Sequence, residues 1–303
     1  MLVRGGSLLN RKFQDRNRPF EVILQGGLGN QLFGWALGLS AKNNTGHDFK
    51  LNCSQLNQWG YQLHKFGIYA QHLEPSKKNP FNHKFYGKLV KKLQYNSFSI
   101  ISNRVLVENS FNFNPRFLNP NPGTTMYGYF QSWKYFESCS DEIIQTLNQT
   151  KMQSNNFVKL AKEFSRFEFA AVHFRRGDYI TNSSFHGLLP NSYFEAGRKE
   201  IQNVFGDIKF ICFTDSKLLA KENLPWCNYF IGPEDLADAA ETLMLMKKAN
   251  AIIGSNSSFS WWAAYLISNY SSLKIFPSVW FKNSSYDIGD LLLPSWMKLD
   301  TKL

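Results

Sequence analysis

The 303-residue chain lacks several features that would assign it to a functional class directly. No Asp-x-Asp pair occurs, so the chain has no carboxylate pair of the kind that holds a divalent metal beside phosphate groups. Its four cysteines, Cys53, Cys139, Cys212 and Cys227, form no Cys-x-x-Cys motif and no Cys/His set at metal spacing. No run approaches the ~18 apolar residues of a transmembrane helix, and residues 1–20 are too polar for a signal peptide. The sequence therefore predicts reduced thiols, no metal site and a cytoplasmic location.

Negative charge is also scarce. The chain carries 23 Asp and Glu against 34 Lys and Arg, a net charge of +11. Such a surplus favours an anionic partner, which could be a nucleotide, a nucleic acid or a membrane surface. Part of it lies in a basic tail, residues 1–20, and part in Lys77 to Lys92, where six lysines interleave with aromatic residues. The second stretch fits either a solvated helix face or a peripheral contact with anionic membrane.

Short apolar runs alternate with helical patterns through the second half of the chain. The expected strands cover 169–174, 208–213, 228–231, 250–253 and 273–276, and the expected helices cover 191–205, 216–223, 235–248 and 259–268. This alternation predicts a parallel sheet wrapped by helices, in which the strands end at one edge and ligands bind there. A long polar helix pattern is expected within 126–160, and Asp215 with Ser216 predicts a helix cap.

Three motifs follow expected strands. HFRRGD at 173–178 carries adjacent arginines, which can bind phosphate bidentately, although a surface ion pair between Arg176 and Asp178 is the alternative. A glycine turn at 26–29 fits neither the dinucleotide nor the P-loop pattern, yet it brings backbone amides close to a helix N-terminus. Small polar residues at 255–258 precede an aromatic helix and can act as a helix cap, an anion cradle or both.

Together these segments resemble the alpha-1,2-fucosyltransferases of glycosyltransferase family eleven. The resemblance rests on GGLGNQLFGWALG at 26–38, HFRRGDY at 173–179 and NSSFSWWAAYL at 256–266, supported by GYFQS at 128–132, FTDS at 213–216 and FPSVWF at 276–281. The order and spacing of the motifs fit as well, and the match runs from about residue 21 to the C-terminus.

The resemblance implies an α/β fold of the two-lobed GT-B-like type, with Rossmann-like parallel sheets and a donor cleft between the lobes. It implies an acceptor-side lobe over 21–165 and a GDP-fucose-binding lobe over 166–303. The implied activity is that of a galactoside alpha-1,2-fucosyltransferase: inverting transfer of fucose from GDP-fucose to the 2-hydroxyl of a terminal β-galactoside on a glycan, without metal or cofactor. A contact with the inner membrane through 77–92 stays an alternative to a purely cytoplasmic protein.

Other functions compete with this one. A fucosyltransferase of another linkage or acceptor, including protein O-fucosylation, would share the arginine pair and the donor pocket. A basic nucleic-acid-binding protein would explain the charge, but no recognition motif for nucleic acid occurs in the chain. An inactive sugar-binding relative is disfavoured because every donor-site motif is intact.

The resemblance also assigns roles around the arginine pair. Arg175 is expected to hold the β-phosphate, and Arg176 to support that pocket or pair with Asp178. His173 is expected to orient the phosphates or the guanine side of the donor. Asp178 and His186 are the candidates for the group that accepts the proton of the acceptor hydroxyl.

The remaining donor contacts are expected from three other segments. The first loop would approach the diphosphate or fucose through Gly27, Gly29 and Asn30, and Asp215 would accept hydrogen bonds from guanine. The other side of the phosphate cradle would come from Asn256, Ser257, Ser258 and Phe259. Arginine and backbone amides can stabilise a departing diphosphate in place of a metal.

Overall fold

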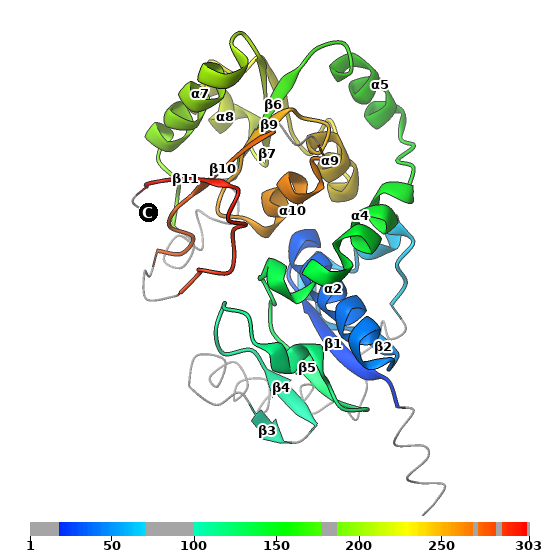
Figure 1. Ribbon diagram of the computed structural model, residues 1–303. Helices are drawn as coiled ribbons and strands as arrows, with labels where there is room; N and C mark the ends of the chain where they lie inside the picture. The colour runs from blue at the N-terminus through cyan, green and yellow to red at the C-terminus, as the bar shows by residue number, and fades with distance from the viewer. Residues whose placement is uncertain are drawn as a thin grey trace, which may run out of the picture. The chain divides into compact units, whose positions relative to one another are not determined.

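The computed structural model describes residues 18–70, 100–102, 104–176, 187–268, 272–282 and 287–301 (Figure 1). The chain divides into two compact units, Met1–Asn148 with Gly289–Leu291 and Gln149–Ile288 with Leu292–Leu303. Each unit is an α/β structure around a largely parallel sheet, which confirms the predicted fold class. Within the described part of the chain, no helix is long and apolar enough to cross a membrane.

The first unit opens with a strand, a glycine turn and a long helix. Its elements are β1 (Phe20–Gln25), α2 (Leu28–Thr45), β2 (Phe49–Gln55), β3 (Ile100–Ser102), β4 (Val105–Val107), β5 (Thr125–Tyr127) and α4 (Ser140–Gln149), with 3-10 helices η1 (Asn57–Trp59), η2 (Leu63–Phe66), η4 (Pro115–Leu118), η5 (Trp133–Tyr135) and η6 (Glu137–Cys139). The sheet order is β2-β1-β5-β4-β3, and β3 alone pairs antiparallel among the described strands. Gly27 is the N-cap of α2, and Gly46 ends the helix in the left-handed conformation at φ 71°.

The second unit follows the predicted alternation closely. Its elements are α5 (Asn155–Phe164), β6 (Phe169–Phe174), α7 (Asn191–Phe205), β7 (Lys209–Thr214), α8 (Lys217–Asn223), β8 (Tyr229–Ile231), α9 (Ala239–Met246), β9 (Ala251–Ile253), α10 (Ser258–Leu266), β10 (Leu273–Pro277) and β11 (Met297–Leu299). All pairs are parallel in the order β11-β10-β9-β6-β7-β8.

Each sheet contains a point at which the strand order reverses. In the second unit the chain runs outward from β6 through β7 to β8 and then returns to β9 on the other side of β6. Helices α7 and α8 therefore cover one face of the sheet, and α9 and α10 cover the other (Figure 1). In the first unit β2 and β5 flank β1 in the same way. Open α/β sheets bind ligands at the carboxyl ends of the strands beside such a reversal.

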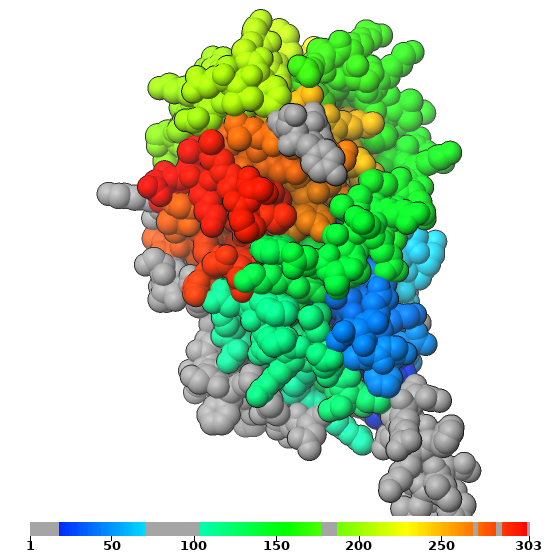
Figure 2. Space-filling view, in the orientation of Figure 1, coloured from blue at the N-terminus to red at the C-terminus, as the bar shows by residue number. Residues whose placement is uncertain are grey.

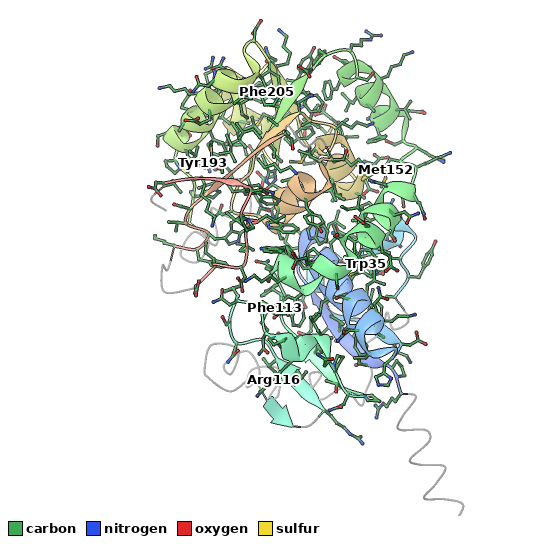
Figure 3. All side chains as sticks on the ribbon, in the orientation of Figure 1. Trp35, Phe113, Arg116, Met152, Tyr193 and Phe205 are labelled. Carbon is green, nitrogen blue, oxygen red and sulfur yellow. The ribbon has the colours of Figure 1, made fainter. Side chains whose placement is uncertain are left out.

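Side chains from α7 anchor it to the centre of its sheet. The hydroxyl of Tyr193, labelled in Figure 3, donates to the carbonyl of Gly254 at 2.6 Å. A Cβ on Gly197 of the same helix would lie 3.0 Å from Ile253, so glycine allows the helix to pack closely on β9. These contacts hold the loop after β9 against a rigid helix.

The predicted domain boundary and one helix need correction. The boundary falls after Asn148 instead of after residue 165, and the long polar helix is two helices, α4 and α5, with a break between them. Ser154 caps α5 and donates through its backbone N–H and its hydroxyl to the Glu241 carboxylate on α9, at 3.1 and 2.7 Å. Helix α5 therefore belongs to the second unit, where it lies at the surface with few buried side chains (Figure 2).

Candidate functional site

Two of the sequence motifs meet at the carboxyl ends of β6 and β9, where the second sheet reverses its strand order. Nδ1 of His173, the fifth residue of β6, lies 2.6 Å from the hydroxyl oxygen of Ser255, which follows β9. The imidazole also packs beside the Phe259 ring, with 5.5 Å between the ring centroids. The predicted convergence of the HFRR and NSSF segments is confirmed.

His173 is a neutral residue in this site. Its side chain is buried, and burial, with the positive charge of Arg175 as the second cause, lowers the pKa of the imidazole to about 3. At neutral pH His173 therefore carries no charge to offer a phosphate. Its hydrogen bond to Ser255 ties the ends of two adjacent strands together.

Arg176 is held inward by the second unit. Its Nη2 donates to the Leu189 carbonyl at 2.8 Å, and the guanidinium lies over the Phe174 ring, 4.2 Å from the centroid. Burial lowers the pKa of the guanidinium, and the nearby Asp215 carboxylate opposes that shift. Of the two predicted roles, support of the pocket fits this geometry; the ion pair with Asp178 falls outside the described residues.

The FTDS segment joins the same site through Asp215. Its Oδ1 accepts a hydrogen bond from the backbone N–H of Arg176 at 2.9 Å, which links the loop after β7 to the loop after β6. The predicted helix cap is correct in its position, because Ser216 is the N-cap residue of α8. Its side chain makes no capping hydrogen bond, however, and Asp215 binds the backbone of Arg176. The proposed contact of Asp215 with guanine stays a prediction.

Arg175 directly follows strand β6. It is half-buried, and its charge acts on the imidazole of His173. A guanidinium that follows a parallel strand suits an anionic ligand because it supplies positive charge and planar donors.

The polar segment after β9 serves the fold as well as the site. The Ser257 hydroxyl accepts from the N–H of Phe259 at 3.3 Å and so caps α10, as predicted. Asn256 is buried and its Nδ2 donates to the Trp280 carbonyl at 3.0 Å, so its amide also holds the C-terminal segment. Ser258 and Phe259 lie half-buried in the first turn. Of the four predicted cradle residues, Asn256 and Ser257 have side chains that make structural hydrogen bonds.

The glycine turn of the first unit forms a second polar cluster, again beside a strand reversal. Gly26 adopts φ 66°, and Nε2 of Gln31 donates to the Gly26 carbonyl at 2.9 Å. Asn30, in the first turn of α2, accepts a hydrogen bond on Oδ1 from Nε2 of Gln131 at 2.7 Å. Gln25, at the end of β1, donates to the carbonyl of Gly128, which follows β5, at 3.0 Å. The GYFQS segment at 128–132 thus meets the predicted loop residues.

The assigned loop glycines differ in position. Gly27 is half-buried at the N-cap of α2, where a Cβ would come within 3.3 Å of the Trp59 ring. Gly29 is buried inside the first turn of the same helix. Donor contact by Gly27, Gly29 and Asn30 stays a prediction.

Sequence reasoning missed two residues of this cluster. The sequence offers Gln131 only within the GYFQS segment, and it gives no role to Glu108 at the end of the run Val-Leu-Val-Glu. Glu108 is 4% exposed, and burial raises the pKa of its carboxyl to about 7 against the opposing hydrogen bonds of two backbone amides. A carboxylate directly after an apolar strand was the available signal.

Asp178 and His186 lie outside the described residues. Across the described ranges, no group of three His, Cys, Asp or Glu side chains could hold a metal ion. The four cysteines are free and buried.

Comparison with known proteins finds glycosyltransferases. A family model described as glycosyl transferase family 11 matches residues 10–300. The O-antigen biosynthesis glycosyltransferase WbnK of Escherichia coli is 28% identical over 302 residues, covering 91% of this chain and 99% of the relative. An alpha-1,2-colitosyltransferase of Escherichia coli is 24% identical over 299 residues, covering 91% and 97%.

Solved structures resemble the chain more distantly. The fucosyltransferase NodZ from Bradyrhizobium is 12% identical, with a TM-score of 0.49, over 82% of this chain and 94% of that chain. A similarity at this level carries no argument about activity.

Proposed function

Because the chain belongs to glycosyl transferase family 11, we propose that it transfers fucose from GDP-fucose to the 2-hydroxyl of a terminal β-galactoside, with inversion and without a metal ion. Two hydrogen bonds, His173–Ser255 and Arg176–Asp215, hold three motif loops together at one edge of the second sheet. This arrangement is the observation that supports a nucleotide-sugar site. Arg175 directly follows β6 at this edge of the sheet.

The donor side of the reaction uses positive charge that is already in place. As the bond between the anomeric carbon and the phosphate oxygen breaks, the diphosphate gains negative charge. Arg175 can bind it bidentately, and the first-turn amides of α10 with their partial positive charge can bind it from the other side. A preorganised donor of this kind contributes about 3–4 kcal/mol to lowering the barrier. Arg176 and His173 act by holding the loops that carry these groups.

The acceptor side completes a single displacement. The 2-hydroxyl oxygen bonds to the anomeric carbon on the face opposite the diphosphate, GDP leaves, and the hydroxyl proton passes to a base or to water. We propose Asp178, three residues beyond Arg175 in the sequence, as that base. One displacement converts the β-linked sugar of the donor into an α-linked product.

Colitose is a second candidate for the transferred sugar. One relative is named an alpha-1,2-colitosyltransferase, which supports the alpha-1,2 linkage while offering a different donor. Colitose is fucose without its 3-hydroxyl, so the two donors differ by one hydrogen-bonding group.

The test offers the purified protein GDP-fucose, GDP-colitose, GDP-mannose and UDP-galactose, each with a panel of β-galactosides, and determines linkage by NMR. A 2-deoxygalactoside is the matched acceptor control, because it lacks only the attacking oxygen. We expect an alpha-1,2-fucosylated product and none from the 2-deoxy acceptor. Preference for GDP-colitose would support the second candidate, and product from a UDP-sugar would refute both.

A further inference from the structure

A buried carboxylate in the first unit holds the turn that follows β5. Oε2 of Glu108 accepts hydrogen bonds from the backbone N–H groups of Tyr129 at 2.7 Å and Phe130 at 2.9 Å. The approach is so close that a Cβ on Gly128 would lie 2.5 Å from the Cβ of Glu108. Glycine at 128 is therefore required for the carboxylate to reach the two amides.

The turn that Glu108 holds contains a strained residue. Phe130 has φ 54°, in the left-handed region that a residue with a bulky side chain rarely adopts. Its buried ring packs on Phe117 and Tyr135, with centroid separations of 5.1 and 6.1 Å. The two hydrogen bonds that the carboxylate accepts and this aromatic packing offset the strain.

The strained turn places Gln131 on the glycine loop. Nε2 of Gln131 donates to Oδ1 of Asn30. This hydrogen bond directs Nδ2 of Asn30 toward Gly26, and a Cβ on Gly26 would lie 2.5 Å from that nitrogen. Oε1 of Gln131 and Oε1 of Glu108 are buried and make no hydrogen bond to any described residue. A polar path therefore runs from Glu108 through the turn and Gln131 to the side chain of Asn30.

We propose that Glu108 is a positioning residue for the sugar-transfer reaction, acting through Gln131 to orient Asn30 at the glycine turn. Glu108 does not need to touch a substrate for this role. Its carboxylate fixes two backbone amides of the turn after β5. The turn then places the side-chain amide of Gln131 on Asn30 at the glycine turn. The inference rests on the proposed function where turnover is the readout.

The experiment combines amide exchange with kinetics on the full chain. Hydrogen exchange is measured for the amides of Tyr129 and Phe130 in Glu108→Ala, Glu108→Gln and Gln131→Leu, with Glu21→Gln as the control for loss of a half-buried carboxylate in the same sheet. We expect at least tenfold faster exchange in Glu108→Ala. Exchange should stay within threefold of the parent protein in the other variants, because Gln retains an acceptor oxygen and Gln131 acts after the turn.

Turnover distinguishes positioning from chemistry. We expect kcat with GDP-fucose to fall at least tenfold in Glu108→Ala and in Gln131→Leu, and to stay within threefold in Glu108→Gln. The double variant Glu108→Ala, Gln131→Leu should be no slower than the slower single variant, because both changes break one path.

Three results would overturn the inference. Independent, multiplying effects in the double variant would mean that Glu108 does not act through Gln131. An inactive Glu108→Gln with protected amides would show that the charge itself takes part in the reaction, and unchanged exchange in Glu108→Ala would remove the structural premise. A parent protein that transfers no fucose refutes the proposed function, and the exchange data still decide whether Glu108 holds the turn. If Glu108→Ala does not fold, Gln131→Leu and Glu108→Gln carry the same test.

Discussion

Exchanging each arginine of the adjacent pair for lysine should separate a binding role from a structural one. Arg176 donates to the Leu189 carbonyl at 2.8 Å and lies 4.2 Å from the centroid of the Phe174 ring. A hydrogen bond from a charged group contributes about 1.5–3 kcal/mol, and a cation over an aromatic ring adds about 0.5–2 kcal/mol. Lysine keeps the charge but loses the planar group that makes both contacts at once.

The two variants should therefore fail in different assays. Because Arg176 is only half-buried, we expect Arg176→Lys to lower the free energy of unfolding by about 1–2 kcal/mol, at the lower end of those contributions. Arg175→Lys should reduce kcat with GDP-fucose by about 100-fold, the loss seen when one preorganised donor is removed.

Urea denaturation followed by circular dichroism measures the stabilities, and initial rates with GDP-fucose measure kcat and KM. Calorimetric titration with GDP measures nucleotide affinity and checks that the Arg175→Lys variant is the one that binds GDP more weakly. Near-normal turnover in Arg175→Lys, or a stable but inactive Arg176→Lys, would refute the division of roles. The second result would transfer phosphate binding to Arg176.

Two further predictions concern metal and pH. Transfer should continue in excess EDTA, because the proposed site stabilises the departing diphosphate with arginine and backbone amides; activity that disappears with EDTA and returns with manganese would contradict this. The pKa of Glu108 is about 7 in the folded protein against 4.5 for an ordinary carboxyl, so its contribution to stability is present below pH 4.5 and is lost as the pH rises through 7. Relative to Glu108→Gln, the parent protein should lose up to about 3 kcal/mol of unfolding free energy between pH 4.5 and 8. Urea denaturation of both proteins measures this, and a difference in unfolding free energy that does not change with pH would refute the buried-carboxylate assignment.

Much of the second unit was predictable because its signals are local. The alternation of apolar runs and helical patterns from 169 to 277 reproduces β6 to β10 within a few residues, since each element is encoded by its own periodicity. The parallel arrangement then places the loops after β6, β7 and β9 at one edge. The Ser257 cap is likewise local, because donor and acceptor are two residues apart.

The unit boundary and the first unit were less predictable. Ser154 and Glu241, whose contact assigns α5 to the second unit, are separated by 87 positions, so no local pattern reveals the pairing. The same holds for Glu108, which follows β4 and whose carboxylate accepts from amides in the turn after the neighbouring strand β5.

The sequence by itself determined which residue types stand at the strand ends, and so the family, the fold class and the set of candidate residues. Tertiary structure alone decided the direction and partner of each side chain: Arg176 onto Leu189, Asp215 onto the backbone of Arg176, and Asn256 onto Trp280. The physical reason is that backbone periodicity depends on neighbours in the chain. A buried polar group is instead satisfied by whichever partner the packed strands and helices bring within about 3 Å.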